Sequence, residues 1–214
     1  MNPSSTEPAT RLTPRGARTR AALVAAARTV FERDGFLAAR VNDIAEEAQV
    51  AYGTFYTYFD DKESIFRAVV ERLGEDFRFS PGRRAGAAPY EQILQANRHY
   101  YDVYVTRGTL MGLLEQVATF SEEFRTMRRV LRHRWVARAE RSIRRWQAEG
   151  TADSDVDAHY AASALGSMVD RSVYIWVVLG EPHDPEVAIE TLTRLWAKAL
   201  GLALPEARRV ACRG

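Results

Sequence analysis

Apolar side chains recur at helical spacing along most of the chain. In the first such segment Leu23, Ala27 and Phe31 share one face, with Thr19 as the expected N-cap and Gly35 as the expected C-terminal stop. No stretch shows the alternation of a half-buried strand, so the sequence predicts an all-α fold of about nine helices. The other predicted helices cover 41–48, 52–58, 62–77, 90–105, 109–120, 121–149, 155–179 and 185–200.

Two segments of biased composition divide the chain. Residues 1–17 are rich in Pro, Ser and Thr and nearly lack large apolar side chains, which predicts a mobile basic arm. Residues 80–89 (SPGRRAGAAP) are the expected connector. These boundaries predict one helical domain over 18–79, a second over 90–205 and a tail over 206–214.

Composition is that of a globular protein, with 46% hydrophobic and 27% charged residues. No apolar run approaches the roughly 20 residues of a membrane span, and the first twenty residues contain no secretory h-region. The lone cysteine, Cys212, forms no internal disulfide. We therefore expect a cytoplasmic protein without membrane contacts.

Charge is distributed unevenly, although the net charge is only +2. Residues 11–40 carry seven arginines, whereas residues 41–64 carry one lysine and six acidic residues. The pattern permits local phosphate contacts, but charge alone would not predict DNA binding.

Two short predicted helices, 41–48 and 52–58, are joined by a three-residue turn. In a helix-turn-helix, the first helix and its neighbours hold the second so that its outward side chains reach base edges. The apolar residues suit inward positions: Ile44, Ala45, Ala48, Val50 and Phe55. The outward residues offer hydroxyls, phenols and a glycine, which suit phosphates and thymine methyls: Tyr52, Gly53, Thr54, Tyr56, Thr57 and Tyr58.

At these residues the chain resembles the TetR (tetracycline-repressor) family. The run 41–65 (VNDIAEEAQVAYGTFYTYFDDKESI) is similar to that family's signature, and the run 26–36 (AARTVFERDGF) to its first helix. The resemblance covers about residues 18–73. It implies that Asn42, Tyr52, Gly53, Thr54 and Thr57 approach bases, and that Tyr56, Tyr58 and Lys62 sit at phosphates.

Two positions depart from the family pattern. A Thr or Ser that would cap the second helix is absent near Arg40, which we expect to contact phosphate instead. Gln49 stands where the family's turn has Gly, so it should adopt a left-handed backbone at a cost of about 1 kcal/mol. Alternatives remain for the tyrosines, which could pack between helices, and for Arg11, Arg15 and Arg18, which could enter a minor groove.

The last two predicted helices carry broad apolar surfaces. Helix 155–179 is apolar nearly all round between Tyr160 and Leu179, which in a domain this small indicates a partner subunit. With helix 185–200 it predicts a four-helix homodimer interface, as the resemblance also implies. The expected interface residues are Leu165, Val169, Val173, Leu192, Leu195, Trp196 and Ala199.

The second domain is also expected to hold a small, largely apolar effector. Asp170 and Arg171 lie in an apolar helix, where they are costly to bury unless paired, and a structural salt bridge is favoured over a ligand contact. Candidate ligand contacts are Tyr101, Tyr104, Arg107, Gln116, Met127, Leu131, Trp135, Met168, Asp170, Ser172 and Trp176; Tyr100, Met111, Leu114 and Glu115 are similar.

Helix 121–149 changes its apolar side along its length. Early apolar residues centre about 100° from the later ones, at the ~3.6 residues per turn of a helix. We expect this helix to bend near His133 or to serve two environments, its first half facing the cavity and its second the helix that joins the domains.

The sequence thus predicts a ligand-responsive repressor that binds a pseudopalindromic DNA operator as a dimer and is released by its effector. An activator, or a regulator answering to a protein partner, would share the fold. A helical enzyme is less favoured, because the four histidines are scattered and no metal-ligand spacing or nucleophile motif occurs. No cofactor or metal is expected.

Overall fold

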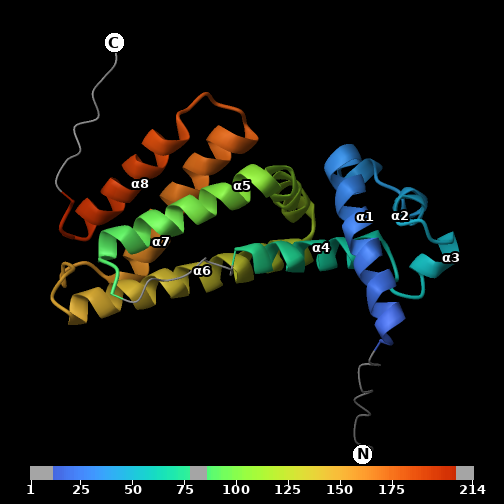
Figure 1. Ribbon diagram of the computed structural model, residues 1–214, viewed down its shortest axis with the longest axis horizontal. Helices are drawn as coiled ribbons and strands as arrows, with labels where there is room; N and C mark the ends of the chain where they lie inside the picture. Colours follow the sequence, from blue (N-terminus) through green and yellow to red (C-terminus); the bar gives the residue numbers. More distant parts are fainter. Residues whose placement is uncertain (1–11, 78–85, 206–214) are drawn as a thin grey trace, which may run out of the picture. The chain divides into compact units, whose positions relative to one another are not determined.

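The computed structural model describes residues 12–77 and 86–205, and within these ranges every regular element is helical (Figure 1). The predicted all-α fold is confirmed, with eight helices of at least one α-turn and a short π-helix. The elements are α1 Pro14–Ala38, α2 Val41–Glu47, α3 Tyr52–Phe55, α4 Lys62–Asp76, α5 Pro89–Phe120, α6 Glu122–Ala148, α7 Ala158–Val173, π-helix η1 Tyr174–Val178 and α8 Pro185–Ala199.

The chain divides into two compact units between Glu71 and Arg72, within α4. The sequence placed the connector later, at 80–89; most of that segment, the arm residues 1–11 and the tail 206–214 lie outside the described residues. None of the helices in the described ranges has the length and apolar character needed to cross a bilayer.

The first helix begins earlier than the sequence predicted. Thr13, not Thr19, is its N-cap: the Thr13 hydroxyl accepts a hydrogen bond from the Gly16 amide at 3.1 Å, and Pro14 follows in the first turn. Residues 14–17, assigned to the mobile arm, are therefore helical. Gly35 has φ 77° and ψ 167°, so the regular helix does stop there as predicted, and one further turn runs to Ala38.

An aromatic cluster forms the core of the N-terminal unit. Phe31 meets Phe66 edge to face with ring centroids 5.0 Å apart, and Phe36 lies 4.9 Å from Phe66. Phe31 and Phe66 are fully buried, as are Ile44 of α2 and Phe55 of α3. Both short helices are thus anchored to α1 and α4 by their apolar side, since neither is long enough to be stable alone.

In the C-terminal unit α5 packs against α6 and α8, and α6 also packs against α7. The two helices predicted over 90–105 and 109–120 form one helix of 32 residues. Gly108 lies within this helix, and a Cβ there would lie 3.3 Å from a methyl group of Val177 of η1, so the glycine allows close packing of the two elements.

The residues that α7 and α8 expose differ from those predicted for the dimer interface. Four of the seven expected residues are buried in the chain's own core and cannot face a partner: Val169, Val173, Leu192 and Trp196. Leu195 and Ala199 are exposed and Leu165 is half-buried. The apolar faces of α7 and α8 thus pack largely within one chain, because α5 and α6 cover them.

Candidate nucleic-acid interface and ligand cavity

The turn between α2 and α3 holds the backbone that the sequence predicted. Gln49 has φ 55°, a left-handed conformation that a non-glycine residue adopts at a cost. The Val50 amide donates to the Ala45 carbonyl at 3.0 Å, which closes the turn. Ala45 itself is buried, and its small side chain lets the two short helices approach closely.

Helix α3 is shorter than predicted, because residues 56–58 form a turn rather than its second half. The Phe59 amide donates to the Phe55 carbonyl at 3.0 Å and continues the chain toward α4. Phe55 is fully buried, with Phe59 5.8 Å away between ring centroids. This anchor fixes which side of α3 faces outward.

Two phenols dominate that outward side. Tyr52 is 51% and Tyr56 47% exposed, and Gly53 and Thr57 beside them are also exposed. The two hydroxyl oxygens lie 2.9 Å apart, and the hydrogen bond with Tyr52 raises the pKa of Tyr56. One of the two hydroxyls donates its proton to the other, and the accepting hydroxyl can still donate its own proton outward, for example to a phosphate.

Lys62 is engaged within the protein. Its ammonium donates to the carbonyls of Leu37 and Ala39, each at 3.2 Å, and lies 4.8 Å above the Phe36 ring. These contacts tie the start of α4 to the chain between α1 and α2. The phosphate contact expected of Lys62 remains a prediction. The structural role of Lys62, which binds two backbone carbonyls, was not predicted from the sequence.

The remaining predicted DNA contacts lie around α2 and α3. Arg40 is exposed at the N-terminus of α2, which has no side-chain cap, as predicted. Asn42 is exposed and donates to Glu46 at 2.6 Å, while Thr54 is half-buried. The half-buried Tyr58 places its hydroxyl 3.4 Å from where a Cβ of Gly16 would lie, so it packs on the first turn of α1.

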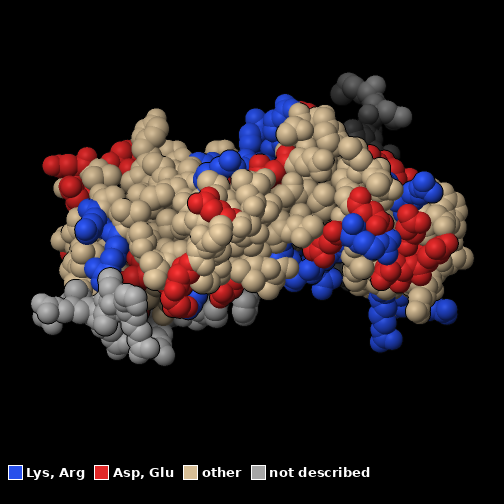
Figure 2. Space-filling model, turned by 90° about the horizontal axis from the view of Figure 1, so that it is seen from above, with Lys and Arg blue, Asp and Glu red and all other residues tan. Residues whose placement is uncertain are grey.

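Of the arm arginines considered as minor-groove readers, Arg15 and Arg18 are part of α1 and cannot extend as a flexible arm. Arg11 lies outside the described residues. On the face that Figure 2 shows, basic and acidic side chains of the N-terminal unit lie next to one another, at the right of the view. Arg33, for example, pairs with Asp34 at 2.7 Å. On this face, DNA contacts would depend on local groups.

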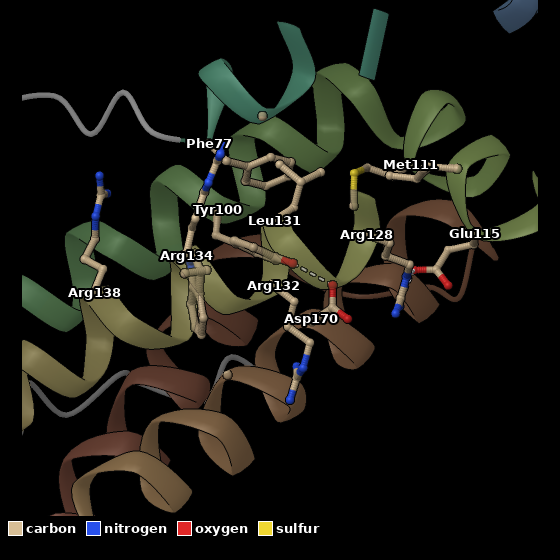
Figure 3. A pocket seen from close by; sticks show the side chains of 14 residues that line it. Phe77, Tyr100, Met111, Glu115, Arg128, Leu131, Arg132, Arg134, Arg138 and Asp170 are labelled. Atoms are coloured by element: carbon tan, nitrogen blue, oxygen red, sulfur yellow. Dashed lines mark hydrogen bonds and ion pairs between the residues drawn. The ribbon is translucent and has the colours of Figure 1, made fainter. Parts of the chain in front are cut away.

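The C-terminal unit contains a cavity of about 120 Å³ that is open to solvent (Figure 3). Its walls come from the end of α4 and from α5, α6 and α7, and most of the lining surface is apolar. The lining residues are Gly74, Phe77, Tyr100, Met111, Leu114, Glu115, Arg128, Leu131, Arg132, Arg134, Trp135, Arg138, Gly166 and Asp170.

A carboxylate with two phenols forms the polar part of this cavity. Tyr100 and Tyr104 both donate to Oδ1 of Asp170, at 2.6 and 2.7 Å. Burial raises the pKa of both tyrosines well above the usual range, and the nearby Asp170 charge adds to this, so both remain donors. Neither Asp170 nor Arg171 has the expected structural salt bridge among the described residues: Asp170 is bound by the two phenols, and Arg171 lies over the Tyr174 ring at 5.0 Å.

Two glycines shape the cavity walls. A Cβ on Gly166 would lie 2.0 Å from Cζ3 of Trp135, so the indole rests directly on the backbone of α7. A Cβ on Gly74 would lie 2.6 Å from Cδ2 of Leu131, which rests in the same way on α4. No residue larger than glycine fits either position without moving an α6 side chain.

Of the predicted ligand residues, Leu131, Trp135 and Asp170 line the cavity. Tyr101 is instead bonded to His183 at 2.8 Å, and Trp176 stacks on the same imidazole. The other six do not line it: Tyr104 donates to Asp170, Arg107 pairs with Asp76 at 2.9 Å, Gln116 lines a separate pocket beside η1, and Met127, Met168 and Ser172 are half-buried elsewhere.

None of the arginines of α6 is among the ligand contacts predicted from the sequence, although their number on one helix was a signal. Figure 3 shows that Arg128, Arg132, Arg134 and Arg138 all belong to the walls around the cavity.

Helix α6 does serve two environments, and its backbone is helical throughout, including His133. Only Phe124 is buried in the first half, where Leu131 faces the cavity; in the second half Ile143 and Trp146 enter the core. The contact with α4 that was expected of the second half is made by the first half, where Leu131 approaches Gly74.

A short helix held outward beside a tight turn, together with a separate helical unit that encloses a cavity, defines a helix-turn-helix transcription regulator. Comparison with known proteins makes this specific. Residues 23–69 match the model of bacterial regulatory proteins of the tetR family, and residues 93–200 match the C-terminal domain of the transcriptional regulator EthR. The chain therefore belongs to the TetR family of transcriptional regulators.

Individual relatives agree with this assignment. The transcriptional regulator EthR of Mycolicibacterium smegmatis is 25% identical over 205 residues, covering 90% of this chain and 94% of the relative. A TetR-family regulator from Rhodococcus sp. superposes with a TM-score of 0.72 at 21% identity, over 86% of this chain and 99% of the other. SmeT, the repressor of a Stenotrophomonas maltophilia multidrug efflux pump, gives 0.71 at 21% identity, over 88% and 94%. These are regulators, so the enzyme alternative is set aside.

Proposed function

We propose that this regulator represses transcription by binding a pseudopalindromic operator as a homodimer, and that a small, largely apolar effector bound in its C-terminal unit releases it. The observation that carries the DNA part is the outward side of α3, where Tyr52 and Tyr56 are half exposed over a buried Phe55 anchor. Exposing two aromatic rings to water is unfavourable, which suits a surface that becomes covered when DNA binds.

Dimerisation is supported by the apolar side chains that α7 and α8 leave in water. Tyr160 on α7 is 75% exposed, and Val187 and Leu195 on α8 are 58% and 46% exposed. We assign these, with Leu165 and Ala199, to the subunit interface in place of the four buried residues. A two-fold dimer would present two α3 helices to half-sites about 34–36 Å apart.

The effector part is supported by the cavity and by helix continuity. Helix α4 supplies Lys62 to the N-terminal unit and Gly74 to the cavity wall. A ligand that prefers one position of the cavity walls would thereby bias the position of a helix that both units share. Its effect on DNA affinity can be no larger than its preference between the two conformations.

A gel shift with the full chain and duplex DNA from upstream of its own gene tests the DNA part. Tyr56→Phe removes one hydroxyl and retains the ring, so we expect roughly a ten-fold loss of affinity, the scale of one hydrogen bond to a charged phosphate. Tyr174→Phe, at a half-buried tyrosine of η1 that belongs to neither proposed interface, is the matched control and should bind normally. Equal binding by both variants would remove the assigned role of Tyr56, and failure of the unaltered chain to bind any duplex at low salt would overturn the proposal.

A further inference from the structure

The cavity in the C-terminal unit has an uneven charge distribution that indicates what it binds. Four arginines and two acidic residues line it. Arg128 forms an ion pair with Glu115, which neutralises both. Asp170 receives two phenol hydrogen bonds on Oδ1. Positive charge therefore exceeds negative charge around a mainly apolar space.

The other arginines differ in what holds them. Arg132 donates only to neutral groups, the hydroxyls of Ser163 and Ser167 and the Ser163 carbonyl, so its charge is not neutralised. Arg134 has no hydrogen-bond or ion-pair partner among the residues that the structure describes, and it is exposed. Figure 3 shows Arg134 and Arg138, one helical turn apart, extending to the same side of α6, whereas Arg132 extends to the other.

Apolar walls lie next to this pair of arginines. Trp135 follows Arg134 directly and packs on Tyr100 with ring centroids 5.7 Å apart, and Phe77 lies 5.2 Å from Tyr100. A molecule that fills this aromatic part would leave one end at the arginines. A cationic end would be repelled there, while an anionic end would gain charge-assisted hydrogen bonds.

We propose that the effector is a small amphiphilic anion, a carboxylate with an aromatic or short aliphatic body, whose body occupies the space beside Tyr100 and Trp135 and whose carboxylate is bound by Arg134. This inference rests on the proposed function, since it names the chemical class of the effector. The neighbouring Arg138 adds positive potential at the same rim. A guanidinium can hold a carboxylate through two parallel hydrogen bonds, which favours this head group over a neutral one.

Calorimetric titration of the full chain with three probes of one shape tests the class. The probes are 3-phenylpropanoate, 3-phenylpropanamide and 3-phenylpropylamine, which are anionic, neutral and cationic at pH 7. We expect the carboxylate to bind at least ten-fold more tightly than the amide, and the amine most weakly. Raising the salt concentration should weaken only the binding of the carboxylate, because screening acts on charge.

Two variants of α6 locate the head group. Arg134→Gln should remove the preference for the carboxylate, and Arg134→Lys should restore part of it. Arg141→Gln is the matched control: Arg141 is also exposed on α6, two turns further on, and does not line the cavity. Circular dichroism should show unchanged folding in all three, since these side chains are exposed.

Equal affinity for the three probes, a preference for the amine, or no binding up to millimolar concentrations would overturn the proposal. A carboxylate preference that survives in Arg134→Gln would overturn the role of Arg134. These titrations contain no DNA, and the gel shift contains no probe. Failure of the anion proposal is therefore distinguishable from failure of the chain to bind an operator.

Discussion

Replacing Lys62 with methionine separates two roles of this side chain. The ammonium donates to the Leu37 and Ala39 carbonyls and lies over the Phe36 ring, and methionine keeps the length of the side chain without its charge. A hydrogen bond from a charged donor is worth about 1.5–3 kcal/mol, and half-burial reduces this to about 1 kcal/mol for each bond. The two bonds together give an expected loss of about 2 kcal/mol, some 30-fold in the local opening equilibrium, because the methionine sulfur keeps a contact with the Phe36 ring in place of the cation–π contact.

Amide hydrogen exchange in the full chain measures this loss where it occurs. All four tryptophans lie in the C-terminal unit, so their fluorescence would not report on the N-terminal unit. Amides at the end of α2, such as that of its C-cap Ala48, which donates to Ile44, should exchange about 30-fold faster in Lys62→Met. The chain's only other lysine, the exposed Lys198 on α8, provides the control: Lys198→Met should leave α2 exchange unchanged.

A purely phosphate-binding Lys62 would behave differently. The slope of log affinity against log salt would fall by about 0.9 for the lost contact, and exchange in α2 would stay the same. That combination would refute the structural reasoning. Faster exchange with an unchanged salt slope would show that Lys62 supports the helix-turn-helix without touching DNA.

Four further predictions follow from single contacts. Gln49→Gly removes the strain of the left-handed backbone at φ 55°, but glycine also gives the unfolded chain more conformational freedom, which opposes this gain. The net effect should slow amide exchange in α2 about two-fold; faster exchange would contradict this prediction. Gly166→Ala should lower stability by about 2 kcal/mol in urea unfolding followed by tryptophan fluorescence, because its Cβ would overlap Trp135; Gly112→Ala, facing one methyl group at 3.3 Å, should cost less. Asp170→Asn weakens two phenol hydrogen bonds and should cost about 1–2 kcal/mol in thermal unfolding, against no loss for the exposed Asp102→Asn. The hydrogen bond from His159, with a second from Arg144, lowers the pKa of the Glu140 carboxyl below its usual value of 4.5. These bonds therefore stabilise the folded chain above pH 4.5, and this stabilisation is lost as the pH falls. Glu140→Gln lacks the titrating carboxyl, so the stability of the variant should decrease less steeply with pH below 4.5.

The helix-turn-helix was predictable because its determinants are local. The turn chemistry at Gln49, the apolar anchor Phe55 and the missing cap at Arg40 can each be read from a few neighbouring residues, and the structure has all three. The length of α3 was overestimated because Tyr56 continues the helical spacing, while the chain turns there toward α4. Spacing alone does not encode that turn.

The cavity could not be predicted in the same way, because pairs distant in sequence determine it. Gly166 accommodates Trp135, and Asp170 joins phenols from α5 some 70 positions away. The same holds for Gly108, whose place within one continuous helix goes with the distant Val177 that packs against it. The buried Val169 and Trp196 were assigned to a partner subunit because an apolar position does not state which chain covers it.

The two glycine contacts also constrain how an effector could act in the proposed mechanism. Leu131 and Trp135 already rest against the backbones of α4 and α7, so neither can move further toward its glycine without displacing that helix. A ligand that enlarges the cavity must therefore move Leu131 away from Gly74 or push the end of α4 with it, since packed interiors compress little. The first motion leaves α4 unsupported at its C-terminal end, and the second shifts it directly. In both cases α4, which also carries Lys62, is the element whose position the effector would bias.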